Sequence, residues 1–283
     1  MQIIRNTNNR KFTLSPWERE VSLGIAGEGI WRILVGIIFI VYFTITSAAT
    51  ASTLESFSFI VFGDSQGNNA MLKDLADRIN REEGIAFCVN NGDSVPSASE
   101  ANYKKFISLS SRISPKVYTV VGNHDVYPGG YGLFHKYFGP TYYSFDYGSA
   151  HFVILDNARA KSFDAKQFNW LKADLAANAQ EHTFVFMHKP VFDPSEIYPD
   201  HIMSGRKVIE ELMAIFRQHK VDYVFAGHIH GYARTVRDGT IYLVTAGAGA
   251  NLYLPREFGG FYHCVRVDVK GNKIKDKVLM LYE

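Results

Sequence analysis

The feature that most constrains this chain is a set of five apolar segments, each of which ends in aspartate, asparagine or histidine. In chain order the segments end as IVFGDSQ, AFCVNNGD, YTVVGNHD, FVFMHKP and YVFAGHIH. Short apolar runs rich in Val, Ile and Phe are typical of buried β-strands. The pattern therefore predicts strands that each deliver polar side chains at one end. A fold that gathers these ends on a rigid scaffold would place the side chains together.

The segments between these runs predict an alternation of strands and helices. Strands are expected at 57–62, 85–89, 116–121, 142–147, 151–156, 183–187, 221–226, 240–245, 262–269 and 275–281. Helices are expected at 69–81, 100–113, 163–177 and 206–219. Gly148-Ser149 and Gly271-Asn272 mark hairpin turns. Alternation with hairpins in the middle and at the end predicts an α/β (α+β) fold, with a mixed sheet or two packed sheets flanked by helices.

The polar residues at the strand ends form a consistent set of metal ligands. Carboxylate, amide and imidazole groups suit a borderline or hard divalent ion rather than a thiolate site. Glycine precedes several of them, which lets the backbone turn sharply and approach a neighbouring group. Each residue alone is more simply a turn cap or a hydrogen-bonded core residue, but five such endings in succession predict a metal site. The candidates are Asp64, Gln66, Asp93, Asn123, His124, Asp125, His188, His228 and His230.

With these residues in view, the chain resembles the calcineurin-like metallophosphoesterases. The series GD, GD, GNHD, H and GHIH matches the motifs of that family over nearly all of residues 57–250. The resemblance implies a two-sheet mixed β-sandwich flanked by helices, with two divalent metal ions (Mn, Mg, Zn or Fe) at one edge. It also implies that Asp93 bridges both ions. The first ion would be held by Asp64, Gln66 and His230, and the second by Asn123, His188 and His228.

The same resemblance implies a reaction. A hydroxide activated by the two metals would attack the phosphorus of a phosphate mono- or diester. His124 would not be a ligand; it would face the scissile phosphate and protonate the leaving oxygen as a general acid. Asp125 either orients His124 or caps a turn. A non-catalytic metal-binding or regulatory module on the same fold is the alternative function.

Gln66 departs from the first motif of the family, which most often has histidine at this position. The amide oxygen of glutamine is neutral and harder than imidazole, so the first ion should be held less tightly, with Mn²⁺ or Mg²⁺ favoured over Zn²⁺. A hydrogen-bonding Gln66 beside a poorly filled site is the alternative. Gly67 stands where purple acid phosphatases supply a tyrosine to ferric iron, so a purple Fe(III) centre is not expected.

Residues 1–51 differ from residues 52–283, which we expect to form one metallophosphoesterase domain. A polar leader precedes an uncharged run, Ile33 to Ile45, which is flanked by Arg32 and by the small residues TSAATA. This pattern is typical of a signal peptide cleaved near Ala51. An uncleaved membrane anchor and a buried core helix are the alternatives. The first two interpretations place the domain outside the cytoplasm, in the periplasm or the extracellular space.

The charge balance indicates which class of partner the chain binds, and the cysteines bear on its redox state. Residues 52–283 hold 25 Lys/Arg and 25 Asp/Glu, without the basic excess typical of nucleic-acid binders. A small phosphate ester is therefore the expected partner, with membrane contact only through the N-terminal segment. Cys88 and Cys264 lie in separate predicted strands, and two buried thiols are expected, although an exported protein could also oxidise them. The loop from Tyr198 to Arg206, which contains His201, is the candidate for substrate selection.

Overall fold

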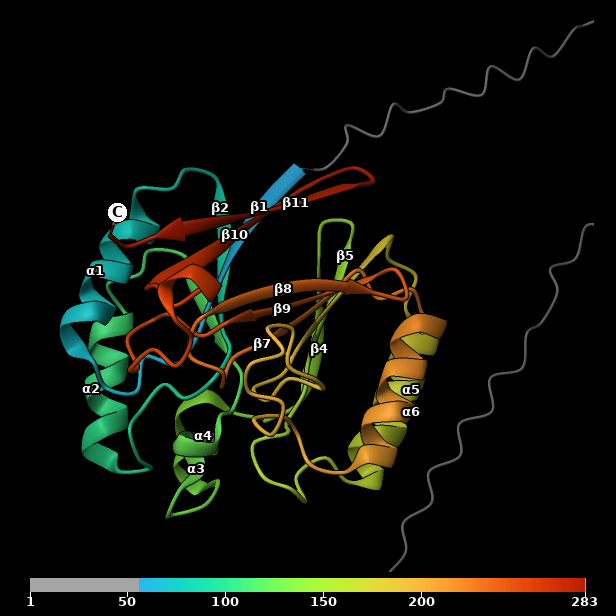
Figure 1. Ribbon diagram of the computed structural model, residues 1–283, viewed down its shortest axis with the longest axis horizontal. Coiled ribbons are helices and arrows are strands. Elements are labelled where there is room, and N and C mark those ends of the chain that lie inside the picture. Colours follow the sequence, from blue (N-terminus) through green and yellow to red (C-terminus); the bar gives the residue numbers. More distant parts are fainter. Residues whose placement is uncertain (1–55, 283) are drawn as a thin grey trace, which may run out of the picture. The chain divides into compact units, whose positions relative to one another are not determined.

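Two β-sheets packed face to face form the frame of residues 56–282, the part of the chain that the computed structural model describes (Figure 1). The first sheet has the order β11-β10-β1-β2-β3, with β1 (Ser56–Phe62), β2 (Ile85–Asn90), β3 (Lys116–Thr119), β10 (His263–Lys270) and β11 (Lys273–Met280). The second has the order β4-β5-β6-β7-β9-β8, with β4 (Tyr143–Tyr147), β5 (Ala150–Ile154), β6 (His182–Phe186), β7 (Tyr223–Ala226), β8 (Tyr232–Arg237) and β9 (Thr240–Thr245). In the first sheet β1, β2 and β3 are parallel, and β10 and β11 extend it with antiparallel pairs. The second sheet has a parallel centre, β5-β6-β7-β9, with an antiparallel strand at each edge.

Helices cover the outer faces of the sheets. Figure 1 shows α1 and α2 on one side of the sheets and α5 and α6 on the other. The helices are α1 (Asn69–Asn80), α2 (Glu100–Ser110), α3 (Asn123–Val126), α4 (Gly132–Phe138), α5 (Ala165–Ala177), α6 (Arg206–Gln218) and the 3-10 helix η1 (Arg256–Phe258). Asn68, Ser99 and Asp164 each accept a backbone N–H of the first turn and so fix where α1, α2 and α5 begin. The predicted fold class is confirmed.

Aromatic side chains fill the layer between the two sheets. The Phe59 ring of β1 meets Phe152 of β5 edge-on at 5.3 Å and Phe184 of β6 at 5.1 Å between ring centroids. Such pairs each contribute about 0.5–1.5 kcal/mol beyond the burial of their surface. The opposite face of each sheet is buried under helices. Because the central strands are buried on both faces, they appear in the sequence as continuous apolar runs rather than as alternating ones.

The sequence patterns miss β8, α3 and α4. We expected 240–245, 262–269 and 275–281 to be antiparallel strands, and this is confirmed for β10 and β11, which join β1 in the first sheet. β9 lies in the second sheet, where it is antiparallel to β8 but parallel to β7. The edge strand β8, with the sequence YARTVR, escapes notice because it is polar and half exposed.

Cys88 and Cys264 are free, buried thiols. They lie on β2 and β10, the two strands that flank β1. Neighbouring strands lie about 4.8 Å apart, so two strand spacings exceed the roughly 7 Å between Cα atoms that a disulfide tolerates. Of the two alternatives left open by the sequence, the reduced pair is the one the fold accommodates.

The signal-peptide or anchor interpretation concerns residues 1–51, which lie outside the described residues. Within 56–282, no helix combines the length and the apolar character that crossing a bilayer requires. The assignment of 52–283 to one domain stays a prediction.

His263 makes the fold sensitive to acid. Its ring is fully buried, with Nδ1 2.9 Å from the carbonyl oxygen of Phe261 and Nε2 3.1 Å from Oγ1 of Thr245. Burial lowers the pKa of His263 from 6.5 to about 4, and the hydrogen bond to Phe261 offsets only part of the shift. The unfolded chain therefore takes up a proton as the pH falls from 6.5 toward 4, whereas the folded chain resists it. The free energy of unfolding therefore decreases as the pH is lowered through this window.

We expect His263 alone to remove about 3 kcal/mol of stability between pH 7 and pH 4. Urea unfolding of the wild-type chain and of His263→Gln, measured across this range, isolates the contribution because the variant lacks the titrating ring. The variant is expected to be less stable at pH 7 and to lose less on acidification. The same pH dependence in both chains would contradict the assignment.

Candidate metal centre

Asp93 lies at the centre of a cluster built by the ends of β1, β2, β3, β6 and β7. It follows β2 and is buried. Its Oδ2 lies 3.3 Å from Nε2 of His188 and accepts the side-chain amide of Gln66 at 3.2 Å. Its Oδ1 accepts the backbone N–H of His124 at 2.8 Å. One carboxylate therefore touches residues from three other strand ends.

One group of predicted ligands includes Asn123, His188 and His228. Nε2 of His188 is 3.0 Å from Oδ1 of Asn123, and the His188 and His228 rings meet at 5.0 Å between centroids. Asp93, His188 and His228 each offer a ligand atom within 4.8 Å of the others. A single ion can therefore contact all three side chains.

The other group includes Asp64, Gln66 and His230. Nε2 of His230 lies 3.5 Å from Oδ1 of Asp64 and accepts the Gln66 amide at 3.2 Å. The Asp64 carboxylate also accepts the backbone N–H of His228 at 3.1 Å. The Gln66 amide thus bridges Asp93 and His230, and Asp93 belongs to both groups.

The backbone is strained where these side chains originate. Seven non-glycine residues of the described chain have a positive φ, and four of them are predicted ligands: Asp64 (64°), Gln66 (41°), Asp93 (51°) and His228 (70°). Such conformations cost on the order of 1–3 kcal/mol each and are concentrated at functional sites. The fold maintains this strain at the cluster, which favours a functional role for the four residues.

Two glycines permit the close approach of these strands. A Cβ at Gly122 would collide with the backbone nitrogen and Oδ1 of Asp93. A Cβ at Gly227 would collide with Oδ2 of Asp64. Glycine before Asn123 and before His228 therefore has the steric role expected from the sequence.

Backbone carbonyls orient two of the imidazoles. Nδ1 of His188 donates to the carbonyl oxygen of Asn91 at 2.9 Å, and Nδ1 of His230 donates to that of Asn251 at 2.7 Å. Each contact leaves Nε2 directed at the cluster. Metal-binding histidines are held in this way, with the far nitrogen fixing the tautomer. The donor set and its orientation fit a centre for divalent ions.

A sequence model of the calcineurin-like phosphoesterases matches residues 57–232. The chain belongs to this family. It is 31% identical over 175 residues to purple acid phosphatase 23 of Arabidopsis thaliana, an alignment that covers 55% of this chain and 37% of the relative. The chain spans about a third of the length of the curated relatives it matches.

Solved structures share the fold of this phosphoesterase. Purple acid phosphatase PPD1 from yellow lupin (Lupinus luteus) seeds superimposes with a TM-score of 0.68 at 17% identity, over 81% of this chain and 52% of that one. A dimetal phosphatase from Danio rerio gives a TM-score of 0.66 at 17% identity, over 80% of this chain and 97% of that one. At these identities the likeness concerns the fold alone.

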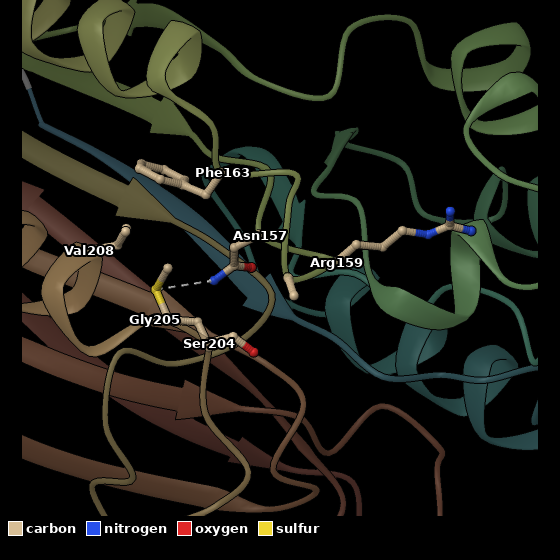
Figure 2. Close-up of a pocket in the computed structure, with 8 residues that line it drawn as sticks. Asn157, Arg159, Phe163, Ser204, Gly205 and Val208 are labelled. Atoms are coloured by element: carbon tan, nitrogen blue, oxygen red, sulfur yellow. Dashed lines mark hydrogen bonds between the residues drawn. The ribbon is translucent and has the colours of Figure 1, made fainter.

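Asn157 is a residue of the candidate metal centre that the sequence analysis missed. Its Oδ1 accepts the backbone N–H groups of His188 at 3.1 Å and Lys189 at 3.0 Å, so it fixes the turn that carries His188. Figure 2 shows Asn157 between Phe163 and Gly205, with its amide directed at the sulfur of Met203, 4.0 Å away. Asn157 follows the β5 sequence as FVILDN. The strand-end pattern used for the other sites would have found it.

Asp125 has the contacts of a turn cap. Its carboxylate is buried and accepts the backbone N–H groups of Gly122, Ser94 and Val95 at 2.8, 2.9 and 3.2 Å. Among the described hydrogen bonds, none joins this carboxylate to the His124 ring. Asp125 therefore positions the loops around Asp93, and we give it no catalytic role.

His124 lies at the open side of the cluster. Nδ1 is 2.9 Å from the carbonyl oxygen of Pro96, and Nε2 is 4.0 Å from Oδ2 of Asp93. The side chain is 40% exposed, whereas those of Asp93 and His188 are almost fully buried. His124 is thus oriented by one nitrogen and presents the other toward both solvent and the predicted ligands.

The charges of the buried cluster favour a cation. Burial would raise the pKa of Asp93, but His188 and His124 outweigh burial and hold that pKa well below its usual range. Burial would lower the pKa of His188, but Asp93 and Asp64 raise it to about 9. Burial, together with His188 and Lys189, lowers the pKa of His228 to about 2, so that ring is neutral, as a ligand must be. The buried carboxylate of Asp93 thus favours a protonated, positively charged His188. A divalent ion could supply this positive charge instead.

Proposed function

We propose that this calcineurin-like phosphoesterase hydrolyses small phosphate mono- or diesters with two divalent metal ions. The observation that carries the proposal is the position of Asp93, whose carboxylate belongs to two separate groups of side chains. The first ion would be held by Asp64, Gln66, Asp93 and His230, and the second by Asp93, Asn123, His188 and His228.

The ligands, His124 and Asn157 would have different roles in hydrolysis. Bound ions would supply activated water and neutralise charge on the phosphoryl oxygens. Only Asp64 and Asp93 carry negative charge among the proposed ligands, so a site loaded with two divalent ions attracts an anionic phosphate. Nδ1–H of His124 donates to the carbonyl oxygen of Pro96, so the imidazolium form of the ring would carry its second proton on Nε2, available to the leaving oxygen. Asn157 would keep His188 in place.

The identity of the metals follows from Gln66 in this proposal. The amide nitrogen of Gln66 lies against both Asp93 and His230, so the amide would have to turn over to offer its oxygen to an ion, in the place where an imidazole would supply a stronger ligand to zinc. We propose that the first ion is held more weakly than the second and that Mn²⁺ is preferred. Gly67 has a φ of 78°, and a Cβ there would meet Pro96, so the tyrosine expected of a ferric centre does not fit without rearrangement.

Gln66→His is expected to raise retention of the first ion and to shift the preference of the site from Mn²⁺ toward Zn²⁺. The imidazole is a better ligand for zinc than the glutamine amide, and the second group of ligands is unchanged. Metal content per chain after gel filtration, for protein loaded with each ion, measures both effects. If the wild-type chain retains two equally bound ions, Gln66 does not weaken the first.

The proposed activity is tested on the full chain after removal of metal with a chelator. Adding Mn²⁺ is expected to restore hydrolysis of 4-nitrophenyl phosphate or bis(4-nitrophenyl) phosphate, and comparing them separates monoesterase from diesterase activity. Metal binding without turnover of either compound would instead support the non-catalytic module. The apolar pattern of residues 33–51 supports export or anchoring of the chain, which would place this activity outside the cytoplasm.

A further inference from the structure

Three aromatic rings stand beside the proposed metal ligands. Tyr253 stacks on His230, with ring centroids 3.9 Å apart and planes inclined by 26°. His201 lies 6.1 Å from His228 and meets Tyr253 edge-on at 5.6 Å. Tyr198 stacks on His201 at 5.2 Å. We refer to Tyr198, His201 and Tyr253 as the aromatic wall.

The aromatic wall joins two loops that are distant in sequence. The Tyr198 hydroxyl donates to the carbonyl oxygen of Tyr253 at 2.9 Å. The backbone N–H of Tyr253 donates to the carbonyl oxygen of His230 at 2.9 Å, which ties the wall to a proposed ligand. On the other side, the Asp193 carboxylate accepts the backbone N–H of Tyr198 at 2.7 Å. These contacts fix the rings relative to the metal centre.

Tyr198 packs against the hydrophobic core, whereas the other two rings of the wall are open to solvent. Tyr253 is 39% exposed and His201 is also exposed, whereas the aromatic rings between the sheets are buried. Aromatic faces left open to solvent at a binding site are available to stack with a ligand. A phosphoryl group bound beside His228 and His230 would have its ester oxygen, and the group attached to that oxygen, within reach of this surface.

We infer that the aromatic wall is a subsite for the leaving group and that the enzyme prefers esters whose leaving group carries an aromatic ring. The inference rests on the proposed function, because it takes the phosphoryl group to bind at the metal centre. An aromatic leaving group can form offset-stacked or edge contacts with Tyr253 and His201, whereas a saturated ring of similar size gains only from burial. The metal ligands do not determine which leaving group is preferred, whereas the aromatic wall would favour an aromatic one.

Benzyl phosphate and cyclohexylmethyl phosphate test this preference. Both release a primary alcohol and both carry a six-membered ring one carbon from the oxygen, so they differ mainly in aromaticity. We expect kcat/KM to favour benzyl phosphate by roughly three- to tenfold, the range that one or two aromatic contacts provide. A ratio near one, with both esters hydrolysed, overturns the inference and leaves the proposed function intact.

Variants at His201 show whether the ring itself provides the preference. His201→Leu is expected to bring the benzyl to cyclohexylmethyl ratio toward one, whereas His201→Phe, which keeps an aromatic face, should retain it. Tyr282→Leu removes an exposed aromatic ring from the far end of the chain, beyond β11, and serves as the control. An equal loss of the ratio in His201→Phe and His201→Leu would overturn the stacking role.

Binding measurements separate the subsite from turnover. Calorimetry with benzylphosphonate and cyclohexylmethylphosphonate on the metal-loaded chain needs no hydrolysis. Tighter binding of the benzyl compound, lost in His201→Leu and kept in His201→Phe, supports the wall. Equal binding of the two overturns it. If neither ester is hydrolysed and bis(4-nitrophenyl) phosphate is not hydrolysed either, the proposed function fails, and the calorimetry still decides the subsite.

Discussion

Asp93→Asn is expected to lower kcat/KM for phosphate ester hydrolysis by roughly a thousandfold and to reduce the metal content of the chain. Asp93 is the one side chain that belongs to both groups of proposed ligands, so its loss weakens both ions at once. Metal ions stabilise the transition state by several kcal/mol, and each 1.36 kcal/mol is tenfold in rate. Removing the charge also leaves His188 without its buried partner, 3.3 Å away. Metal analysis after gel filtration and initial rates measure the two effects.

Asp174→Asn is the matched control for this experiment. Asp174 is also a largely buried carboxylate paired with histidine, since its Oδ2 lies 2.8 Å from Nε2 of His151. That pair belongs to the contact between β5 and α5, and no proposed ligand takes part in it. The control is expected to keep its metal and its rate, at some cost in stability. An Asp93→Asn chain that kept both ions and wild-type rates would remove the basis of the proposed function.

The sequence predicted which polar side chains lie together better than it predicted the connectivity of the sheets. Strand ends that deliver Asp64, Asp93 and His188 are visible because buried strands are short apolar runs and a polar residue after them stands out. The pairing partners of such runs leave no comparable trace. β9 and β10 both contain several β-branched residues, yet one joins the second sheet and the other the first. Only the packing of the two sheets around the aromatic layer decides between them.

Some site features depend on contacts between residues that are far apart in the sequence. Asn157 stabilises the His188 turn through backbone hydrogen bonds across 31 residues of sequence. The aromatic wall brings Tyr198 to Tyr253, 55 residues apart. Asp125 was ambiguous in the sequence because GNHD places it beside His124 in the chain, while its carboxylate is directed toward the loop after Asp93. His124 and Asp125 are adjacent in the sequence, but their side chains point in different directions from the same turn.

His124→Ala is expected to lower kcat by about 10²–10⁴-fold for an alkyl phosphate and much less for 4-nitrophenyl phosphate. An alkoxide is a poor leaving group that needs a proton in the transition state, whereas 4-nitrophenolate leaves without one. His124 is placed for this role because Pro96 orients its Nδ1 and the ring stands 4.0 Å from Asp93 at the open side of the centre. Rates for the two esters, measured with the same metal loading, give the comparison.

His135→Ala is the matched control for His124→Ala. His135 is also an exposed imidazole whose Nδ1 lies 2.9 Å from a backbone carbonyl oxygen, that of Gly139, but it belongs to α4 and not to the metal cluster. Its removal should leave both rates unchanged. A loss in His124→Ala that is equal for the two esters would show that His124 binds the phosphoryl group rather than protonating the leaving oxygen, because phosphoryl contacts do not depend on the leaving group.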